Sequence, residues 1–348
     1  MAKKRIAVGL SGGIDSTVAA YLLKRKGFEV LGFTLKFYPQ ENRCCDLDSL
    51  DQAKRLCHFL DIPHYVLDVG DSFRTKVIDY FSESYLKGQT PNPCAYCNRF
   101  IKFGIFFEKV KSFGADYLAT GHYTGLVKKR GTYLFRKAKD LKKSQEYFLS
   151  LVRPDILKFL IFPLTNYTKP QVEKIAKDKK LLFKQRKESQ DVCFVKDKQY
   201  PQFIEENLKS PASYAGNIVD QNGDVLGKHK GIYYYTYGQR SGLGVAHKHP
   251  LYVTAIDSQS KNVIVGNRDS LCQSEFLVHS VNWFTDPGKR KVKVKVRYNA
   301  QEVPCSLDLT GNRVKVRLVN KIDSIAPGQV AAFYYKDLLL GAGIIVKA

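Results

Sequence analysis

Short apolar runs and amphipathic stretches alternate along the first 200 residues of the chain. The strand-like runs and the helical patterns between them lie at 5–10, 16–26, 28–35, 48–60, 64–69, 72–86, 98–113 and 116–120. When parallel strands are joined by crossover helices, the helices cover the faces of the sheet. The alternation therefore predicts an α/β fold over residues 1–200, a doubly wound parallel sheet with helices on both faces.

The pattern changes after residue 200. Short strand-like runs are separated by turns rich in Gly, Asn and Asp, such as the turn at 221–224. Strands at this spacing form small sheets and barrels. We predict a small β-rich central domain over residues 201–270 and a C-terminal β-barrel domain over residues 271–348.

Basic residues outnumber acidic residues in this chain. The 56 Lys and Arg residues and the 33 Asp and Glu residues give a formal net charge of +23. Such an excess repels itself, and a polyanionic partner such as nucleic acid relieves the repulsion. A lysine-rich surface without such a partner is the alternative, but the charge favours nucleic acid.

No apolar run approaches the ~20 residues that a membrane span needs. The basic start, Met1–Arg5, reaches a glycine turn too soon for a signal peptide, and it lacks the composition of a transit peptide. We therefore expect a cytoplasmic protein with no membrane partner. Its eight cysteines should then be thiols rather than a disulfide scaffold. Cys57 lies on an apolar helical stripe, and we expect Cys44 and Cys45 to be structural.

A glycine turn, Ser11-Gly12-Gly13-Ile14-Asp15-Ser16, follows the first predicted strand and opens the first helix. Backbone N–H groups at such a helix start bind anions. The turn matches neither the Walker pattern nor the dinucleotide fingerprint, and it contains no lysine. It resembles the PP-loop of the ATP pyrophosphatases, which grips the pyrophosphate of ATP. The turn alone leaves open GMP, NAD and argininosuccinate synthetases as well as tRNA-modifying relatives, and a plain turn is the structural alternative.

A proline-rich loop at 88–98 carries a C-x-x-C pair, Cys94 and Cys97. The prolines stiffen the loop, and Cys97 is predicted at the start of the helix that follows. A helix start lowers the pKa of a thiol from ~8.5 toward neutrality. The pair by itself is ambiguous: it is compatible with a redox pair, half of a zinc site, or chance.

Four motifs, in this order, identify a family. They are Thr-Pro-Asn-Pro at 90–93 followed by Cys97-Asn98, Ser-Gln-Asp-Val-Cys-Phe at 189–194, Tyr-Gly-Gln-Arg-Ser-Gly-Leu-Gly at 237–244, and Ala-Pro-Gly-Gln at 326–329. Together with the glycine turn they cover nearly the whole chain. The sequence resembles the tRNA-specific 2-thiouridylase family, MnmA, within the PP-loop ATP pyrophosphatase superfamily.

The resemblance implies a reaction. ATP, with Mg²⁺, adenylates O2 of the wobble uridine U34, a persulfide delivers sulfur to C2, and AMP and pyrophosphate are released. The implied substrates are the tRNAs with U34 that accept Lys, Glu and Gln. The implied sulfur source is a persulfide donor such as a cysteine desulfurase or a sulfur-relay protein.

The resemblance also implies site residues. Cys193 would carry the persulfide, and Cys97 would release the sulfur or close a transient disulfide with Cys193. Asp15 would serve Mg²⁺. The residues implied for ATP are Gly9, Leu10, Ser11, Gly12, Gly13, Ile14, Asp15, Ser16, Leu35 and Gly121. The residues implied for tRNA are Asn92, Pro93, Cys94, His122, Lys143, Ser144, Gln145, Arg297, Tyr298 and Gln329.

The chain departs from the family pattern at three positions: two of the residues implied for tRNA, Ser144 and Cys94, and the neighbouring Glu146. Ser144 stands where an aspartate is usual, and Glu146 stands where a serine is common. Cys94 stands where some relatives have an acidic residue. Cys94, Cys97 and Cys193 could therefore hold a [4Fe–4S] cluster, or zinc, as alternatives to the persulfide route that we favour.

Valines alternate with basic residues over 289–298. A strand with this pattern has one apolar face and one cationic face. It is either a solvated strand face or, as the tRNA substrate favours, a surface that tracks phosphates. Two rival functions, a small-molecule amidating ligase and a non-catalytic RNA-binding protein, do not account for two cysteines beside an intact glycine turn.

Overall fold

The computed structural model describes residues 3–37, 47–181, 192–195, 199–208, 211–323 and 325–346 of the chain. The chain divides into two compact units. The first comprises Met1–Val77, Cys94–Lys196 and Lys336–Leu340, and the second comprises Ile78–Pro93, Asp197–Tyr335 and Gly341–Ala348. Cys44, Cys45 and the motif residues 189–191 lie outside the described residues.

A five-stranded parallel sheet forms the centre of the first unit. Its strands lie in the order β3-β2-β1-β4-β7. Their bounds are β1 (Arg5–Gly9), β2 (Glu29–Lys36), β3 (His64–Asp68), β4 (Tyr117–Ala119) and β7 (Leu160–Ile161). The chain builds outward from β1 in both directions, so the topological switch point lies between β1 and β4. Ligands of such sheets bind at this point, beyond the carboxyl ends of the strands.

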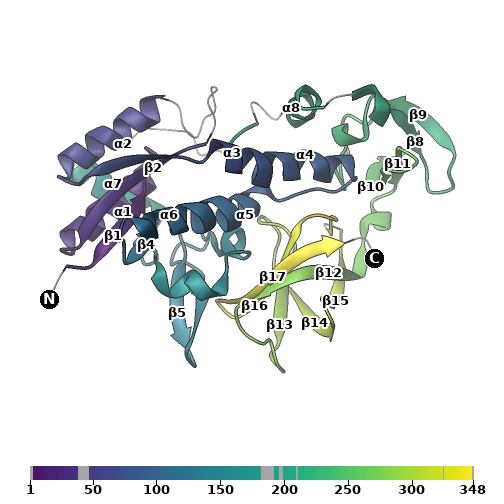
Figure 1. Cartoon of the computed structure of the whole chain (residues 1–348). Helices are drawn as coiled ribbons and strands as arrows, with labels where there is room; N and C mark the ends of the chain where they lie inside the picture. Colours follow the sequence, from purple (N-terminus) through teal and green to yellow (C-terminus); the bar gives the residue numbers. More distant parts are fainter. Residues whose placement is uncertain are drawn as a thin grey trace. The chain divides into compact units, whose positions relative to one another are not determined.

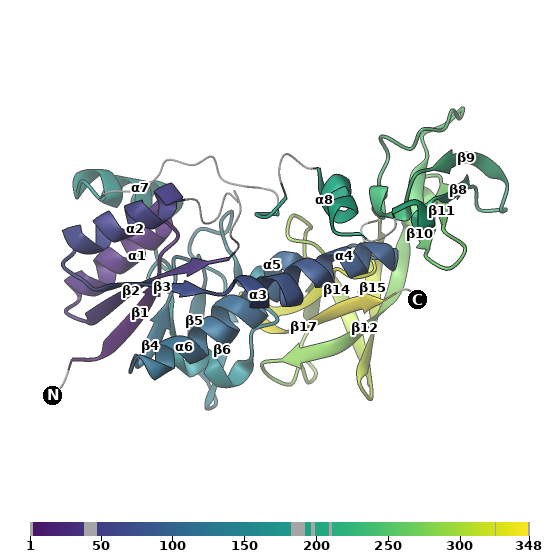
Figure 2. The same cartoon turned by 45° about the horizontal axis from the view of Figure 1, so that its top comes forward.

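Helices cover both faces of this sheet, which confirms the predicted doubly wound fold. Figures 1 and 2 show α1 (Ile14–Arg25), α2 (Leu47–Phe59) and α7 (Lys169–Asp178) on one face and α6 (Phe106–Ser112) on the other. Helix α1 ends before Gly27, as predicted, because glycine adopts the positive φ of +82° that stops a helix.

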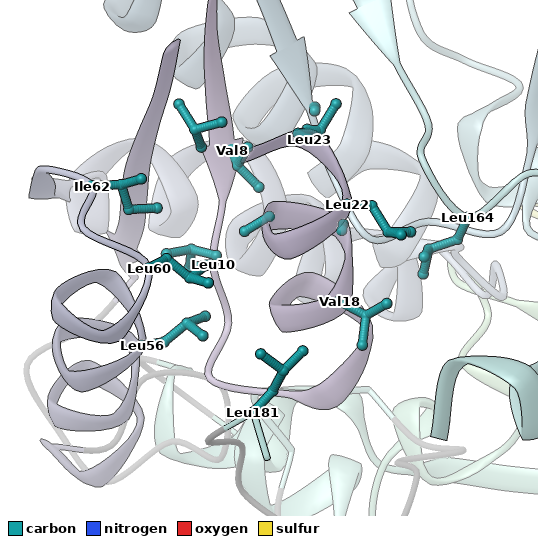
Figure 3. Close-up of a cluster of buried hydrophobic side chains, with 14 of the residues drawn as sticks. Val8, Leu10, Val18, Leu22, Leu23, Leu56, Leu60, Ile62, Leu164 and Leu181 are labelled. Carbon is teal, nitrogen blue, oxygen red and sulfur yellow. The ribbon is translucent and has the colours of Figure 1, made fainter. Parts of the chain in front are cut away.

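Alternate strand residues supply two separate cores. Val8 of β1 and Leu10, which directly follows this strand, pack with Leu23 of α1 and Leu56 of α2, among other leucines drawn in Figure 3. On the opposite face, Phe33 of β2 lies 5.8 Å from Phe106, measured between ring centroids. Full burial of one such side chain stabilises the fold by about 1.5–3 kcal/mol, so these two layers fix the position of the strand ends.

A β-hairpin that the sequence pattern did not predict follows β4. Strands β5 (Gly125–Lys129) and β6 (Thr132–Arg136) pair antiparallel. The two residues between them, Arg130 and Gly131, both have positive φ, which is typical of a tight hairpin turn. Strand β6 also pairs through Arg136 with Leu338, from the last strand of the chain. The short helices η3 (Glu146–Leu149) and η4 (Pro154–Phe159) complete the connection to β7.

Two helical stretches contain a wide, π-helical segment. The first runs through α3 (Gly70–Phe73), η1 (Arg74–Ile78) and α4 (Asp79–Leu86), and the second through α5 (Pro93–Tyr96), η2 (Cys97–Ile105) and α6. Segments η1 and η2 are π-helical, a form that is frequent at functional sites. The second stretch begins at Pro93 rather than near residue 98, because proline suits the first position of a helix.

The second unit contains a small sheet with the order β10-β11-β8-β9. Its strands are β8 (Gly216–Val219), β9 (Val225–His229), β10 (Tyr252–Asp257) and β11 (Asn262–Gly266). Buried Ile218, Ile232, Val253 and Val263 form its core. Short helices accompany it: α8 (Tyr200–Glu206), η5 (Pro211–Tyr214), η6 (Ile232–Tyr234) and η7 (Asp269–Leu271).

A six-stranded barrel follows, as the sequence predicted. Its strands are β12 (Gln273–Trp283), β13 (Val292–Lys295), β14 (Val303–Thr310), β15 (Arg313–Ile322), β16 (Val330–Tyr335) and β17 (Leu338–Val346). Strand β12 pairs with both β15 and β17, and this pairing closes the barrel. Within the described ranges, no helix has both the length and the apolar character needed to cross a bilayer.

Candidate active site

The glycine turn after β1 is held by hydrogen bonds among its own residues. The Gly13 N–H donates to Ser11 Oγ at 3.4 Å, and the Ser16 hydroxyl donates to the Gly13 carbonyl at 2.9 Å. Gly12 has a φ of +71°, and a Cβ there would lie 3.1 Å from the Ser49 carbonyl oxygen of α2. The turn therefore requires glycine at this position, and it directs the first N–H groups of α1 toward the end of β1.

A second glycine, Gly121, closes the other side of the switch point. It follows β4, and a Cβ there would lie 2.7 Å from both the carbonyl carbon of Asp15 and the nitrogen of Ser16. These neighbours are backbone atoms, which cannot rotate away. The start of α1 can thus approach the end of β4 this closely only because residue 121 has no side chain.

These two glycine segments border a cavity of about 220 Å³. Seven residues implied for ATP line it: Gly9, Leu10, Ser11, Asp15, Ser16, Leu35 and Gly121. Gly12, Gly13 and Ile14 belong to the same turn. Phe33, Phe37 and Phe106 add an apolar wall, while the turn supplies backbone donors. An apolar wall opposite a row of N–H groups suits a nucleotide, with the base against the wall and the phosphates at the helix start.

The Asp15 carboxylate makes contacts that the sequence did not reveal. Lys169 Nζ, on the first residue of α7, donates to both carboxylate oxygens at 2.8 and 2.9 Å. The Tyr123 hydroxyl donates to the same carboxylate at 2.8 Å. Lys169 is 154 positions away in the chain, so no local pattern could have indicated this pairing.

Lys102 is a cation in the lining of this cavity, and the sequence analysis missed it too. It comes from the π-helical segment η2, five residues after Cys97. His122, implied for tRNA, lies in the same lining, and its Nδ1 is 2.7 Å from the Thr120 hydroxyl. Burial, and then the charge of Lys102, lower the pKa of His122 well below its ordinary value. The imidazole is therefore neutral near pH 7.

The cysteine pair occupies the start of the second helical stretch. Because the helix begins at Pro93, Cys94 lies in its first turn and Cys97 in its second, so the premise that put Cys97 at a helix start is wrong. Cys94 is exposed and Cys97 is buried. The neighbouring Asn98 anchors this segment by donating to the Phe148 carbonyl at 2.9 Å.

Cys193 belongs to the same compact unit as Cys97. Its neighbour Phe194 is buried and packs edge-on against Phe73 of α3, with ring centroids 5.7 Å apart. Neither Cys97 nor Cys193 is in a disulfide. Among the described residues, no three His, Cys, Asp or Glu side chains are grouped to hold a metal ion, so the iron–sulfur and zinc alternatives gain no support.

Ser144 and Glu146, two of the three departures from the family pattern, are partners of one another. The Ser144 hydroxyl donates to Glu146 Oε2 at 2.5 Å, and both residues are buried. Where the family pattern has a carboxylate at position 144 and a hydroxyl at position 146, this chain has the hydroxyl at 144 and the carboxylate at 146. Ser144 also accepts from the Ala138 N–H, so its tRNA contact, which stays a prediction, would compete with this network.

Gln145, which the resemblance implied for tRNA, lies in the lining of the nucleotide cavity. Its Oε1 accepts from the Tyr123 N–H at 2.8 Å, and its own N–H donates to the Tyr123 carbonyl at 2.7 Å. The same tyrosine donates its hydroxyl to Asp15. Gln145 therefore supports the nucleotide site through Tyr123, and its implied tRNA contact stays a prediction, as does that of Lys143.

The remaining residues implied for tRNA lie in the second unit. Arg297 donates to the Tyr237 carbonyl at 3.2 Å, and Lys295 lies over the Tyr298 ring at 5.3 Å. Val292 and Val294 are buried while Lys291 and Lys293 are exposed, so the predicted alternation is present over 291–294, although β13 covers only Val292–Lys295 of the predicted stretch. Asn92 and Pro93 are buried at the end of the loop that leads to the cysteines.

The fold and site together define a class: an α/β nucleotide-binding unit with a phosphate-binding glycine turn, continued by a small β domain and a barrel. The chain matches the family models described as tRNA methyl transferase HUP domain over residues 4–197, tRNA methyl transferase PRC-barrel domain over 201–267 and Aminomethyltransferase beta-barrel domain over 273–345. It is 41% identical to the tRNA-specific 2-thiouridylase MnmA of Clostridium acetobutylicum, over 98% of this chain and 99% of the relative. It is 40% identical to MnmA 1 of Syntrophus aciditrophicus, over 99% of this chain and 94% of the relative. The chain belongs to the tRNA-specific 2-thiouridylase family.

Proposed function

We propose that this protein is an ATP-dependent tRNA uridine 2-sulfurtransferase that converts U34 to 2-thiouridine and releases AMP and pyrophosphate. One observation carries the proposal: a single compact unit holds the nucleotide cavity and both cysteines, Cys97 and Cys193. The relatives are named 2-thiouridylases. An amidating ligase would have no use for the two thiols.

The cavity fits ATP on its own geometry. The N–H groups at the start of α1 suit phosphate oxygens, and the wall that includes Phe33, Leu35 and Phe106 suits an adenine ring. ATP supplies the adenylyl group that makes O2 of the uracil a good leaving group. Asp15 is the carboxylate suited to hold Mg²⁺, once that ion replaces Lys169 as its counter-charge.

Two lysines compensate for the absence of a lysine in the glycine turn. Lys102 lines the cavity directly. Lys169 forms an ion pair with Asp15, which also lines the cavity. We propose that Lys102 stabilises the negative charge that develops on the phosphates during adenylation, where a fixed cation in a water-poor site acts strongly. Neutral His122 adds no second charge and can face the uracil of the substrate.

Sulfur transfer uses the two cysteines in sequence. A persulfide donor places a sulfane sulfur on Cys193, and the terminal sulfur attacks C2 while AMP leaves. The Cys97 thiolate then attacks Cys193 Sγ, which cleaves the sulfur–sulfur bond, leaves the sulfur on C2 and forms a Cys97–Cys193 disulfide. Two electrons from a cellular thiol reductant restore both cysteines. Cys94, exposed beside the base-binding loop, contacts the substrate without carrying sulfur.

The three domains expected from the sequence divide these tasks in our proposal. Residues 1–200 adenylate, residues 201–270 connect, and the barrel at 271–348 binds tRNA through Arg297, Tyr298 and the exposed Lys291 and Lys293. The substrates would be U34-containing tRNAs for Lys, Glu and Gln, and the donor a cysteine desulfurase or sulfur-relay protein. Because ATP and tRNA are both available in the cytoplasm, the reaction would occur there.

The test is reconstitution with purified protein, ATP, Mg²⁺, a persulfide donor and a tRNA transcript that contains U34. We expect 2-thiouridine at position 34 by mass spectrometry, with one AMP released per sulfur inserted. The same transcript with C34, and the Cys193→Ser variant, are matched controls that should yield no thiolated nucleoside. Sulfur at another position of the tRNA, or AMP release without thiolation by the wild type, would contradict the proposal.

A parallel measurement separates the two sulfur routes. In the persulfide route, Cys94→Ala retains most of the thiolation, whereas a cluster ligated by Cys94 would be lost with it. Stoichiometric iron and acid-labile sulfide after anaerobic purification, together with an inactive Cys94→Ala variant, would overturn the persulfide route and leave the thiolation of tRNA intact.

A further inference from the structure

The loop that leads to the cysteines begins at a closed helix end. Helix α4 ends with the Gly88 N–H donating to the Tyr85 carbonyl and the Gln89 N–H donating to the Ser84 carbonyl. This is the Schellman arrangement, in which a glycine with positive φ stops the helix. The four residues that follow α4 and its cap, 88–91, are called the 88–91 loop below. Its first residue is therefore fixed by local bonds.

The far end of the 88–91 loop is fixed by the barrel. The connection between β15 and β16 contains the Ala-Pro-Gly-Gln motif, called the 326–329 turn. Gln329 Nε2 donates to the Thr90 carbonyl at 3.0 Å and to the Pro91 carbonyl at 3.1 Å. In return, the Thr90 N–H donates to the Pro327 carbonyl at 2.7 Å. These three bonds join segments that are far apart in the sequence, and all of them lie within the second unit.

Two glycines allow the close approach that these bonds need. A Cβ on Gly328 would lie 2.9 Å from Gln89 Cβ and 3.1 Å from the Thr90 nitrogen. A Cβ on Gly88 would lie 2.7 Å from the Ile256 carbonyl oxygen of β10. The loop is thus clamped between the small sheet and the barrel, at distances that no other residue type permits.

The Gln329 amide has no proton left for another partner. A side-chain NH₂ group donates two hydrogen bonds, and both acceptors are carbonyl oxygens of the 88–91 loop. The residue implied for tRNA is therefore already engaged inside the protein. Its donors reach tRNA only if it releases the loop.

We propose that Gln329 is a positioning residue for the cysteine helix: through its two amide donors it acts on sulfur transfer by holding the 88–91 loop. Pro91 is two residues before the start of α5, whose first turn contains Cys94 and whose continuation contains Cys97. A shift of this loop therefore shifts the helix start and both thiols. The expected effect on the rate of thiolation rests on the proposed function, whereas the expected effect on the position of the 88–91 loop does not.

The loop has room to move when the bonds are removed. A cavity of about 460 Å³ lies against it, lined by Lys87, Gly88 and Gln89 on one side and by Pro327 on another. Gln89 directly precedes Thr90, so without the bonds to Gln329 this end of the loop can relax toward the space. A displacement of about 1 Å at a reacting group lowers a rate by up to about 10²-fold.

The deciding variant is Gln329→Met, which keeps the length of the side chain and removes both donors. Gln259→Met, on an exposed turn, is the matched control. The first measurement needs neither tRNA nor ATP: amide hydrogen exchange in peptides that cover Thr90, and the rate of alkylation of Cys94 by iodoacetamide. We expect faster exchange at Thr90 and an altered alkylation rate in Gln329→Met, with both unchanged in Gln259→Met.

The second measurement is kinetic. For Gln329→Met we expect the rate of thiolation at saturating tRNA to fall by about 10- to 100-fold, while the dissociation constant for tRNA stays within about twofold of the wild-type value. The mirror result, unchanged exchange and a tRNA affinity weakened as much as thiolation, would identify Gln329 as a tRNA contact and overturn the inference. Gly328→Ala adds a methyl group that clashes with Gln89 and Thr90 but removes no donor. It should also speed exchange at Thr90, alter the alkylation rate of Cys94 and lower the rate of thiolation.

The two hypotheses fail in different ways. If the wild-type protein does not thiolate U34, the proposed function is wrong, while exchange at Thr90 and alkylation of Cys94 still decide whether Gln329 holds the loop. If the wild-type protein thiolates and Gln329→Met changes neither exchange nor alkylation, the inference is wrong and the proposed function stands.

Discussion

The glycine turn at 11–16 and the 88–91 loop both deliver reactive groups, but they are held in opposite ways. The turn is closed by bonds among its own residues, such as Ser16 to Gly13. The loop depends on Gln329, 239 positions from Thr90. A short motif can therefore position the phosphates of a nucleotide wherever a strand meets a helix, whereas the cysteine loop acquires its position only when the barrel is folded.

The largest effect should come from the turn, and it should leave the loop untouched. Asp15→Ala removes the carboxylate that would serve Mg²⁺ and strips Lys169 of its anion. We expect AMP formation to fall by about 10²–10³-fold, with tRNA affinity nearly unchanged. AMP release is measured with U34-containing tRNA present. Alkylation of Cys94 should match the wild type; a changed rate would show that the two regions are coupled and so break the comparison.

Gly121→Ala tests whether the nucleotide site depends on backbone contact alone. The added methyl group would lie 2.7 Å from backbone atoms of Asp15 and Ser16, so the start of α1 must move away from the end of β4. We expect the rate of AMP formation to fall by about 10²-fold. Gly131→Ala is the control: it strains a hairpin turn with φ +83° but meets nothing within 4 Å, and its activity per folded molecule should equal that of the wild type.

A smaller effect is expected on the barrel. Lys293 lies on β13 and Lys291 directly precedes this strand. Both side chains are exposed, so each can reach a phosphate. Replacing both with glutamine should flatten the slope of log affinity for tRNA against log salt by about 0.7–0.9 for each phosphate that the variant no longer neutralises. Adenylation should not change at saturating tRNA. An unchanged slope would mean that this face of the strand is merely solvated.

The smallest effect concerns pH. The folded protein holds the pKa of His122 well below its ordinary value of 6.5, chiefly by burial. As the pH falls below 6.5, the unfolded chain binds a proton at this histidine before the folded protein does, so the free energy of unfolding decreases. His122→Gln should remove part of this decrease in urea unfolding measured from about pH 7.5 to about pH 5.5, and the exposed His247→Gln should not. Equal slopes in all three proteins would contradict the assigned cause.

Local patterns were sufficient for four of the five strands of the parallel sheet and for the helices between them, but not for β7 and α7. The alternation over 5–120 predicted β1 to β4 because each strand end is marked by a turn or a helix start nearby. The same reasoning found the glycine turn, and it found the alternating strand at 291–294 because buried valines recur at every second position. The hairpin of β5 and β6 was missed although Arg130-Gly131 is a turn signal, since its flanking residues do not alternate clearly.

Features that depend on distant partners could not be read from any window of sequence. The π-helical segment that brings Lys102 into the nucleotide cavity, the pairing of Lys169 with Asp15, and the exchange of roles between Ser144 and Glu146 each require the folded chain. Gln329 is the extreme case, because its motif was recognised while its partners were not.

The pairing of Arg136 with Leu338 has a consequence for the order in which the chain can fold during synthesis. Arg136 of β6 pairs with Leu338, which the ribosome adds much later. The next residue, Lys137, likewise donates its N–H to the carbonyl of Asp337. At about 5–20 residues per second, that interval lasts roughly 10–40 s. Until then the edge of the β5–β6 hairpin is open to chaperones or to other nascent chains, and the nucleotide-binding unit is complete only when the last strand of the barrel has emerged.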